Sequence, residues 1–304
     1  MEGFYLPADL HCHTRLSDGS LGIEDIILLA SRRGIKTIAI TDHDCQAATV
    51  RGKIIGKRQG IKVIPGVELS AFHKESGKQV SFLCYLSDKP NRLEGLCRIN
   101  SLARRKASQL MIARASKRFP ISSELVIKCA AGSTNIYPQH IMHALMECGY
   151  TTEIFGSLYE ELFNPESPDN IFVQPKFAEP KDVLEQIHNA NGVAILTHPV
   201  KSGNVDLIDT LVDYGLDGIE VWNPYHSEED TKNLLKIANE KKILVTGGSN
   251  FQGMYSSSAT KLGEYSTPDD EFNRLVNYQA KKKRARKKEE IAKEAEAIEK
   301  AKAK

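Results

Sequence analysis

The first 95 residues repeat one pattern of apolar and polar positions. A short run rich in β-branched residues is followed by a polar segment and then by apolar residues at helical spacing, and the helical stretches close on Gly34 and Gly60. This alternation is typical of βα units. The predicted strands are 4–10, 36–41, 62–67 and 79–86, and the predicted helices are 23–33 and 46–59.

The same alternation returns after about residue 180. Ser227 followed by Asp230 has the spacing of a capping box, which predicts the start of a helix. Strands joined by helices are usually parallel, so their carboxyl ends meet on one face of a barrel or open sheet. We therefore predict one α/β domain formed by residues 1–95 and 175–280. The predicted helices of the second part are 181–190, 206–214 and 228–241, and its predicted strands are 193–197, 218–222 and 243–247.

Two segments fall outside this alternation. Residues 96–174 carry apolar residues at helical spacing and are too long and too patterned for a loop, so we expect a mostly helical inserted subdomain. Residues 281–304 are rich in Ala, Glu and Lys with few large apolar residues. We expect them to form a tail that buries little and is dispensable for the fold.

Charge is distributed unevenly along the chain. The formal net charge is +2, but residues 281–304 hold 11 of the 41 Lys and Arg and only 5 of the 39 Asp and Glu, which leaves 30 basic and 34 acidic residues elsewhere. The globular part therefore gives no reason to expect a nucleic-acid-binding face. The basic run 281–288 could bind nucleic acid weakly, but no aromatic residue interleaves with its charges to stack a base, and a solvated helix is the alternative.

Composition also indicates the compartment. No stretch approaches the roughly 18 apolar residues of a membrane span, and the N-terminus lacks the pattern of a secretory signal. The six cysteines contain no CxxC pair, which favours reduced thiols over disulfides or a structural zinc site. We expect a soluble cytoplasmic protein with no membrane partner.

Polar residues with metal-ligating side chains follow the predicted strands. Because the carboxyl ends of parallel strands meet, these residues should converge on one site. Imidazoles suit Zn, Fe or Mn, and carboxylates can bridge ions. The histidines of an isolated His-x-His pair can instead be packed within a strand, so the prediction of a metal site rests on the whole set of residues. The set is His11, His13, Asp18, Asp42, His43, Glu68 and His198.

The order and spacing of these motifs resemble the PHP (polymerase and histidinol phosphatase) family. The matching segments are ADLHCH at 8–13, SDG at 17–19, AITDHD at 39–44, PGVELS at 65–70 and THP at 197–199. The resemblance covers about residues 4–95 and 179–256, and the helical insertion is similar to that of the family's small-nucleotide phosphoesterases.

The resemblance implies a distorted (β/α)7 barrel holding up to three divalent ions. It implies that His11, His13 and Glu68 hold the first ion, that Glu68 and His198 hold the second, and that Asp18 and His43 hold the third. Glu68, Asp18 and His43 would be the catalytic residues, and a hydroxide formed on the metal would attack phosphorus.

Three further residues are candidates for binding substrate phosphate. Lys201 closely follows His198, His226 lies beyond the predicted strand 218–222, and His140 lies in the insertion. Each has an ordinary alternative, namely a surface lysine, a loop histidine and a buried helix residue. The related branch has a phosphate-binding Arg near His140, where this chain has Pro138 and Gln139, so the resemblance does not supply that contact here.

Three positions depart from the family pattern. Ser81 replaces a histidine of the fourth strand, and Asn250 and Gln252 replace an Asp-x-His after the seventh. Asn250 remains a candidate ligand because its amide oxygen can bind a hard cation, but each proposed ion loses one of its usual ligands. His73 could compensate for Ser81, although an edge or loop histidine is the simpler interpretation.

Two functions follow from this pattern. The chain is either a metal-dependent phosphoesterase acting on a small phosphate ester, such as a nucleotide, or a related protein that binds metal or a phosphorylated ligand without efficient turnover. We favour the enzyme, with metal occupancy reduced by Ser81, Asn250 and Gln252.

Overall fold

The computed structural model describes residues 8–302 and contains a seven-stranded sheet whose strands follow one another in chain order. The strands are β1 (Asp9–Cys12), β2 (Thr37–Ile40), β3 (Lys62–His73), β4 (Lys78–Tyr85), β5 (Val193–Leu196), β6 (Gly218–Trp222) and β7 (Leu244–Gly247). Helices α1 (Ile23–Arg32), α2 (Ala48–Gln59), α7 (Pro180–Asn189), α8 (Ile208–Asp213) and α9 (Glu228–Lys241) connect or flank them. The predicted alternation of strands and helices is therefore present among the described residues, whereas residues 4–7 of the first predicted strand lie outside them.

Strand β4 runs against its neighbours, contrary to the expectation of parallel strands throughout. It pairs antiparallel with both β3 and β5, whereas the other neighbouring strands pair parallel. Only Lys74–Gly77 separate β3 from β4, with Gly77 at φ +68°. So short a connection can join only antiparallel neighbours, since a parallel crossover needs a dozen or more residues.

Strand β3 is also longer than predicted. It continues from Lys62 through Glu68 to His73 and is paired with β4 over its second half. Glu68 therefore lies within a paired strand rather than in a loop after it, so its backbone is fixed on both sides.

The edges of the sheet approach each other. An isolated parallel bridge joins Cys12 to Phe251, just beyond β7, and the backbone N–H of His13 donates to the carbonyl of Phe251 at 2.9 Å. The segment after β7, which contains the short helix Gly253–Tyr255, is thereby held beside the end of β1.

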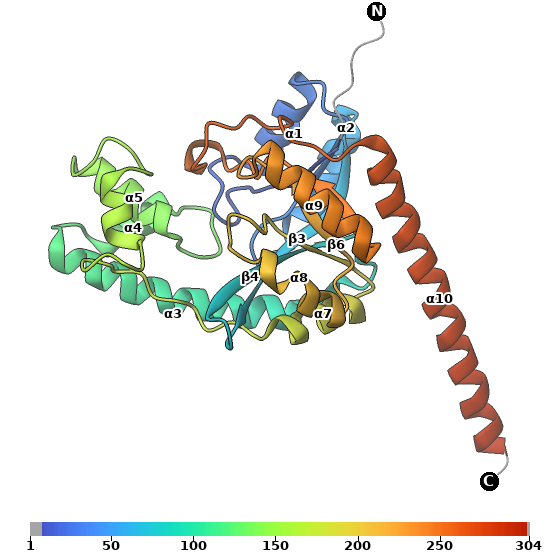
Figure 1. Ribbon diagram of the computed structural model, residues 1–304. Coiled ribbons are helices and arrows are strands. Elements are labelled where there is room, and N and C mark those ends of the chain that lie inside the picture. The colour runs from blue at the N-terminus through green and yellow to red at the C-terminus, as the bar shows by residue number, and fades with distance from the viewer. Residues whose placement is uncertain (1–7, 303–304) are drawn as a thin grey trace, which may run out of the picture.

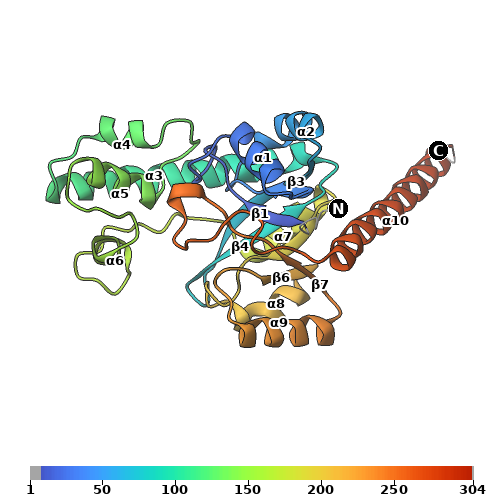
Figure 2. The same cartoon turned by 90° about the horizontal axis from the view of Figure 1, so that it is seen from above.

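The insertion between β4 and β5 is helical, as expected. It consists of α3 (Glu94–Arg118), preceded by the short helix Pro90–Leu93, and of α4 (Ser123–Cys129), α5 (Pro138–Glu147) and α6 (Ser157–Phe163). Much of it lies to one side of the sheet in both views (Figures 1 and 2). It has a hydrophobic core of its own, which includes Met111, Ile141, Leu145 and Leu162.

Helix α10 (Asp269–Lys302) crosses residue 281 without a break and projects away from the body on the side opposite the insertion (Figures 1 and 2). Phe272 and Leu275 near its start are buried against the sheet. Lys282 binds Asp217, and Arg286 hydrogen bonds to the carbonyl of His188. The first part of the predicted tail thus contacts the body. Its composition does not reveal this, because the contacts are made by the charged ends of long lysine and arginine side chains, whose acceptors are identified only by the fold.

None of the helices within residues 8–302 is both long and apolar enough to span a bilayer.

Candidate metal centre and cleft

The first cluster of metal-ligating side chains joins the end of β1 to the middle of β3. His11 and His13 are two residues apart, so the extended chain directs both rings to the same side. Their Nε2 atoms lie 3.1 and 3.3 Å from Oε2 of Glu68. All three residues are buried, and their ligand atoms lie within 4.8 Å of one another.

A second cluster continues from His13 toward the surface. His13 Nδ1 lies 3.2 Å from Oδ1 of Asp18, and His43 Nε2 lies 3.5 Å from Oδ2 of the same carboxylate. His43 Nδ1 is 3.7 Å from Oε1 of Glu68. Glu68 therefore lies between the two clusters, as a bridging ligand must.

Glu220, which the sequence analysis did not single out, holds two of the predicted ligands. This fully buried residue of β6 accepts a hydrogen bond from His11 Nδ1 at 2.8 Å and another from the backbone N–H of His198 at 2.8 Å. The contact leaves His11 Nε2 directed at Glu68. The rings of His198 and His11 are stacked with centroids 6.0 Å apart, so His198 lies beside the first cluster. A carboxylate behind a ligating histidine fixes its ring orientation and raises its basicity.

The side-chain oxygen of Asn250 is buried without a hydrogen-bond donor among the described residues. The backbone of Asn250 is left-handed at φ +45°. A buried amide oxygen without a donor is costly unless something positive binds it. This orphaned oxygen, together with the imidazoles and carboxylates of the two clusters, fits a divalent ion.

Ser81 and His73 occupy different parts of the hairpin. Ser81 on β4 pairs with Ser70 on β3. His73 pairs with Lys78 at the far end of the hairpin, where its Nδ1 contacts the hydroxyl of Ser76 at 2.8 Å. Three residues of extended chain separate His73 from Ser70, roughly 10 Å, so His73 is not placed to replace a ligand at position 81.

Burial and charge set the protonation of the clusters. Burial alone would lower the pKa of His11, but the charges and hydrogen bonds of Glu220 and Glu68 raise it to about 10. Burial opposes ionisation of Glu68, yet His43 and His11 hold its pKa well below the usual range. For His198 burial dominates and lowers the pKa to about 4, which leaves a neutral imidazole suited to metal binding.

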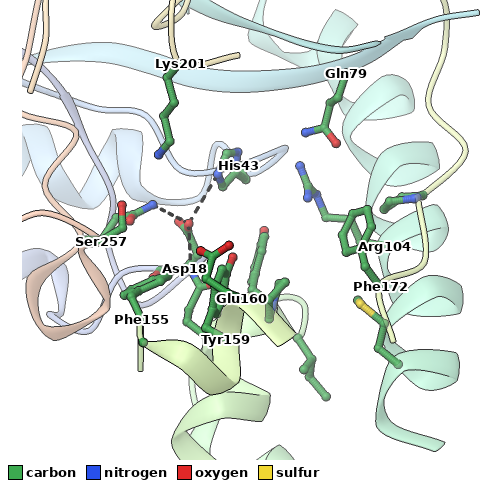
Figure 3. Close-up of a pocket in the computed structure, with 18 residues that line it drawn as sticks. Asp18, His43, Gln79, Arg104, Phe155, Tyr159, Glu160, Phe172, Lys201 and Ser257 are labelled. Atoms are coloured by element: carbon green, nitrogen blue, oxygen red, sulfur yellow. Dashed lines mark hydrogen bonds and ion pairs between the residues drawn. The ribbon is translucent and has the colours of Figure 1, made fainter. Parts of the chain in front are cut away.

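A cleft of about 670 Å³ opens beside the second cluster, between the sheet and the insertion. Asp18 and His43 line it from the strand ends, and Lys201 and Arg104 reach into it from different sides of His43 (Figure 3). Arg104 of α3 pairs with Asp44 at 3.0 Å. Aromatic and apolar side chains of the insertion complete the wall, among them Met111, Tyr137, Phe155, Tyr159 and Phe172.

Comparison with known proteins identifies the family. The PHP domain family matches residues 9–300. The chain belongs to the PHP family. A phosphoribosyl 1,2-cyclic phosphate 1,2-diphosphodiesterase from Eggerthella lenta is 30% identical over 250 residues, which cover 81% of this chain and 94% of that protein. A 3′,5′-nucleoside bisphosphate phosphatase from Chromobacterium violaceum is 25% identical over 251 residues, covering 80% of this chain and 86% of the relative.

A solved structure supports the same assignment. A Bifidobacterium adolescentis protein assigned to the metal-dependent phosphoesterases superimposes with a TM-score of 0.79 at 26% identity, covering 88% of this chain and 95% of that one. The resemblance to the PHP family drawn from the sequence motifs is thus confirmed, and the two named relatives are enzymes that act on phosphate esters.

The three predicted phosphate-binding residues of this PHP protein lie in different places. Lys201 lines the cleft, with its ammonium 3.5 Å from the centroid of the Tyr225 ring. His226 is buried and contacts the carbonyl of Val221 at 2.8 Å, and it is not among the described residues lining the cleft. His140 is also buried, and burial lowers its pKa to about 4. It borders a smaller cavity of about 250 Å³.

Two PHP site residues missed by the sequence analysis carried different signals. Glu220 stands alone in the apolar run GIEVW, and a single charge in a buried strand was a usable sign of a partner. Arg104 lies among several basic residues of α3, and only the fold distinguishes it from its solvent-exposed neighbours.

Proposed function

We propose that this PHP protein is a divalent-metal-dependent phosphoesterase that hydrolyses a small phosphate ester, with a nucleotide as the substrate class. The observation that carries the proposal is the convergence of His11, His13 and Glu68 with Asp18 and His43 at the floor of a cleft. The Eggerthella lenta and Chromobacterium violaceum relatives act on small phosphate esters of ribose and of nucleosides.

The proposed ligands follow the family pattern. His11, His13, Glu68 and Asn250 would hold one ion, and Glu68 with His198 a second. Asp18 and His43 are the ligands of a third ion in the pattern. Mn, Fe and Zn suit this mixture of imidazoles and carboxylates. Such ions supply a hydroxide nucleophile near neutral pH and positive charge for the phosphoryl oxygens.

Side chains of the cleft would bind and orient the ester. The ammonium of Lys201 and the guanidinium of Arg104 supply two separate positive charges near Asp18 and His43. Tyr159 and Phe172 of the insertion offer apolar surface for the base or sugar of a nucleotide and exclude water from that side.

We also propose that the sheet closes as the distorted (β/α)7 barrel of the family, with the insertion at 96–174 as a separate lobe. The bridge between Cys12 and Phe251 supports closure between β1 and the segment after β7. Closure would bring His11 beside the Asn250 loop. We expect the protein to act in the cytoplasm.

A phosphate-release assay tests the proposal. The purified protein, reconstituted with Mn²⁺, Fe²⁺ or Zn²⁺, would be offered a nucleoside monophosphate, a nucleoside 3′,5′-bisphosphate and a cyclic ribose phosphate. We expect metal-dependent hydrolysis of at least one ester, seen as released phosphate or, for the cyclic ester, as the ring-opened monoester, and loss of that hydrolysis in Glu68→Gln. The absence of both products with every ester and metal-loaded protein would contradict the proposal.

The alternative is a protein that binds a phosphorylated ligand without efficient turnover. Ser81, Asn250 and Gln252 favour it because none supplies the imidazole or carboxylate that the family pattern has there. Saturable nucleotide binding by a metal-loaded protein that releases no phosphate would support this alternative.

A further inference from the structure

The carboxylate of Asp18 is held by two side-chain amides. Gln252 Nε2 donates to Oδ2 of Asp18 at 2.6 Å, and Gln139 Nε2 donates to the same oxygen at 3.1 Å. Dashed lines converge on Asp18 from several sides in Figure 3. Gln252 is one of the residues that departs from the family pattern, which has a histidine there.

These contacts join three parts of the chain. Asp18 belongs to the loop after β1, Gln139 to the first turn of α5 in the insertion, and Gln252 to the segment after β7. The backbone of Gln252 is fixed as well, because its carbonyl accepts from the N–H of Ser20 at 2.9 Å and its N–H donates to Ser256 Oγ at 2.9 Å. These two backbone hydrogen bonds hold the loop in a position from which the side-chain amide of Gln252 faces Asp18.

The two amides occupy the oxygen of Asp18 that lies nearer to His43. A carboxylate offers about four acceptor sites, two on each oxygen. Oδ2 of Asp18 receives both amides and lies 3.5 Å from His43 Nε2, so an ion bound between Oδ2 and His43 would have to displace them. Oδ1 lies 3.2 Å from His13 Nδ1 and 3.2 Å from the hydroxyl of Ser17, which makes a shorter bond of 2.6 Å to Oδ1 of Asp42.

Both glutamines direct their N–H groups, rather than their oxygens, at Asp18. With no ion between them, a glutamine oxygen turned toward Asp18 would bring two partly negative oxygens together, which is unfavourable. The N–H groups instead donate to a charged acceptor, and such charge-assisted bonds are short and strong.

We propose that Gln139 and Gln252 form an amide clamp that holds the Asp18 carboxylate by hydrogen bonds in place of the third ion. Metal is then confined to the His11, His13 and Glu68 side of the centre, and Asp18 serves as a fixed acceptor that ties the insertion to the floor of the cleft. The proposal rests on the proposed metal-dependent function and specifies how many ions this chain can hold.

Metal titration of Gln252 variants tests the clamp. Gln252→Met keeps the length of the side chain but removes the N–H, so Asp18 regains free lone pairs. Equilibrium dialysis against Mn²⁺ with elemental analysis should then show tighter binding of the weakest ion, by roughly tenfold, the size of effect that partners of a ligand usually have. Gln252→His should add one further ion per chain.

A matched control uses another glutamine of the same cleft. Gln79 lines the cleft but bonds to Gln174 rather than to Asp18. Gln79→Met and Gln79→His should leave both the number of ions and their affinity at the wild-type values. If Gln252→Met does not fold by circular dichroism, Gln139→Met removes the other donor and carries the same expectation.

The outcomes separate the clamp from the function on which it rests. Weaker metal binding in Gln252→Met would overturn the clamp, because it would make the Gln252 oxygen a ligand. Unchanged metal content in Gln252→His would overturn it as well. Wild-type protein that binds no Mn²⁺ at all would refute the metal-dependent function, and the clamp proposal with it.

Discussion

Asp217, the residue before β6, holds helix α10 to the sheet through Tyr278 and Lys282. Removing its carboxylate should destabilise the protein in a pH-dependent way. The carboxylate accepts a hydrogen bond from the backbone N–H of Ala194 at 2.9 Å and one from the hydroxyl of Tyr278 at 2.6 Å. Lys282 Nζ lies 2.9 Å and His188 Nε2 3.2 Å from the same side chain, which is only 5% exposed.

The size of the effect follows from the pKa. Burial opposes ionisation of Asp217, but His188 and Lys282 outweigh it and lower the pKa from 3.8 to about 2. One pKa unit corresponds to about 1.4 kcal/mol, so the ionised carboxylate contributes on the order of 2 kcal/mol to the free energy of unfolding. Because the pKa is lower in the folded state, this contribution is complete above about pH 4 and is lost as the pH falls toward 2.

Denaturant unfolding of Asp217→Asn at several pH values measures this contribution. We expect a loss of about 2 kcal/mol near pH 7 that shrinks below about pH 4. Asp206→Asn is the matched control, since Asp206 also pairs with a lysine, Lys78, at 2.7 Å but its side chain is 64% exposed. Exposed ion pairs contribute little, so the control should unfold nearly as wild type does.

Truncation gives an independent test of the same contact. Ending the chain at Ala280 removes Lys282, so Asp217→Asn should cost less in the shortened protein than in the full chain. Deleting only residues 289–304 retains Lys282 and should preserve the full effect. An equal loss at all pH values, or a loss in the truncated protein as large as in the full chain, would refute the reasoning.

Three further predictions concern the metal centre. Glu68→Ala should remove more bound metal than Lys201→Ala by elemental analysis, because Glu68 contacts histidines of both clusters whereas Lys201 lines the cleft; equal metal content would contradict the bridging role. Glu220→Ala should weaken metal binding by roughly 10–100-fold in dialysis, and Glu220→Gln by less, because an amide oxygen can still accept from His11. Asn250→Asp should tighten binding at the first cluster, since it returns a negative charge to the position of an orphaned oxygen.

The sequence was most informative for strands and helices, whose positions depend on the local pattern of apolar residues. Apolar runs and glycine stops located the strands and helices of the βα units, and the capping box at Ser227 marks the start of α9 as predicted. The direction of β4 was not predicted because the strand pattern is the same in either direction, and only the short connection after His73 revealed a hairpin.

The remaining site residues depend on long-range contacts. Glu220 lies more than 200 positions from His11, and Gln139 is brought to Asp18 by the packing of an insertion whose placement no motif specifies. Lys282 resembles the other lysines around it, and its partner Asp217 is known only from the fold.

Because the insertion has a hydrophobic core of its own, the substrate preference of this protein could evolve separately from its proposed metal centre. The reactive floor is built on strand ends, while much of the opposite wall stands on helices with their own hydrophobic interior. Replacing Tyr159 or Phe172 would reshape the wall of the cleft proposed to receive the ester without changing the strands that carry the proposed metal ligands. Selection for a new ester could therefore act on the insertion while those ligands stay as they are.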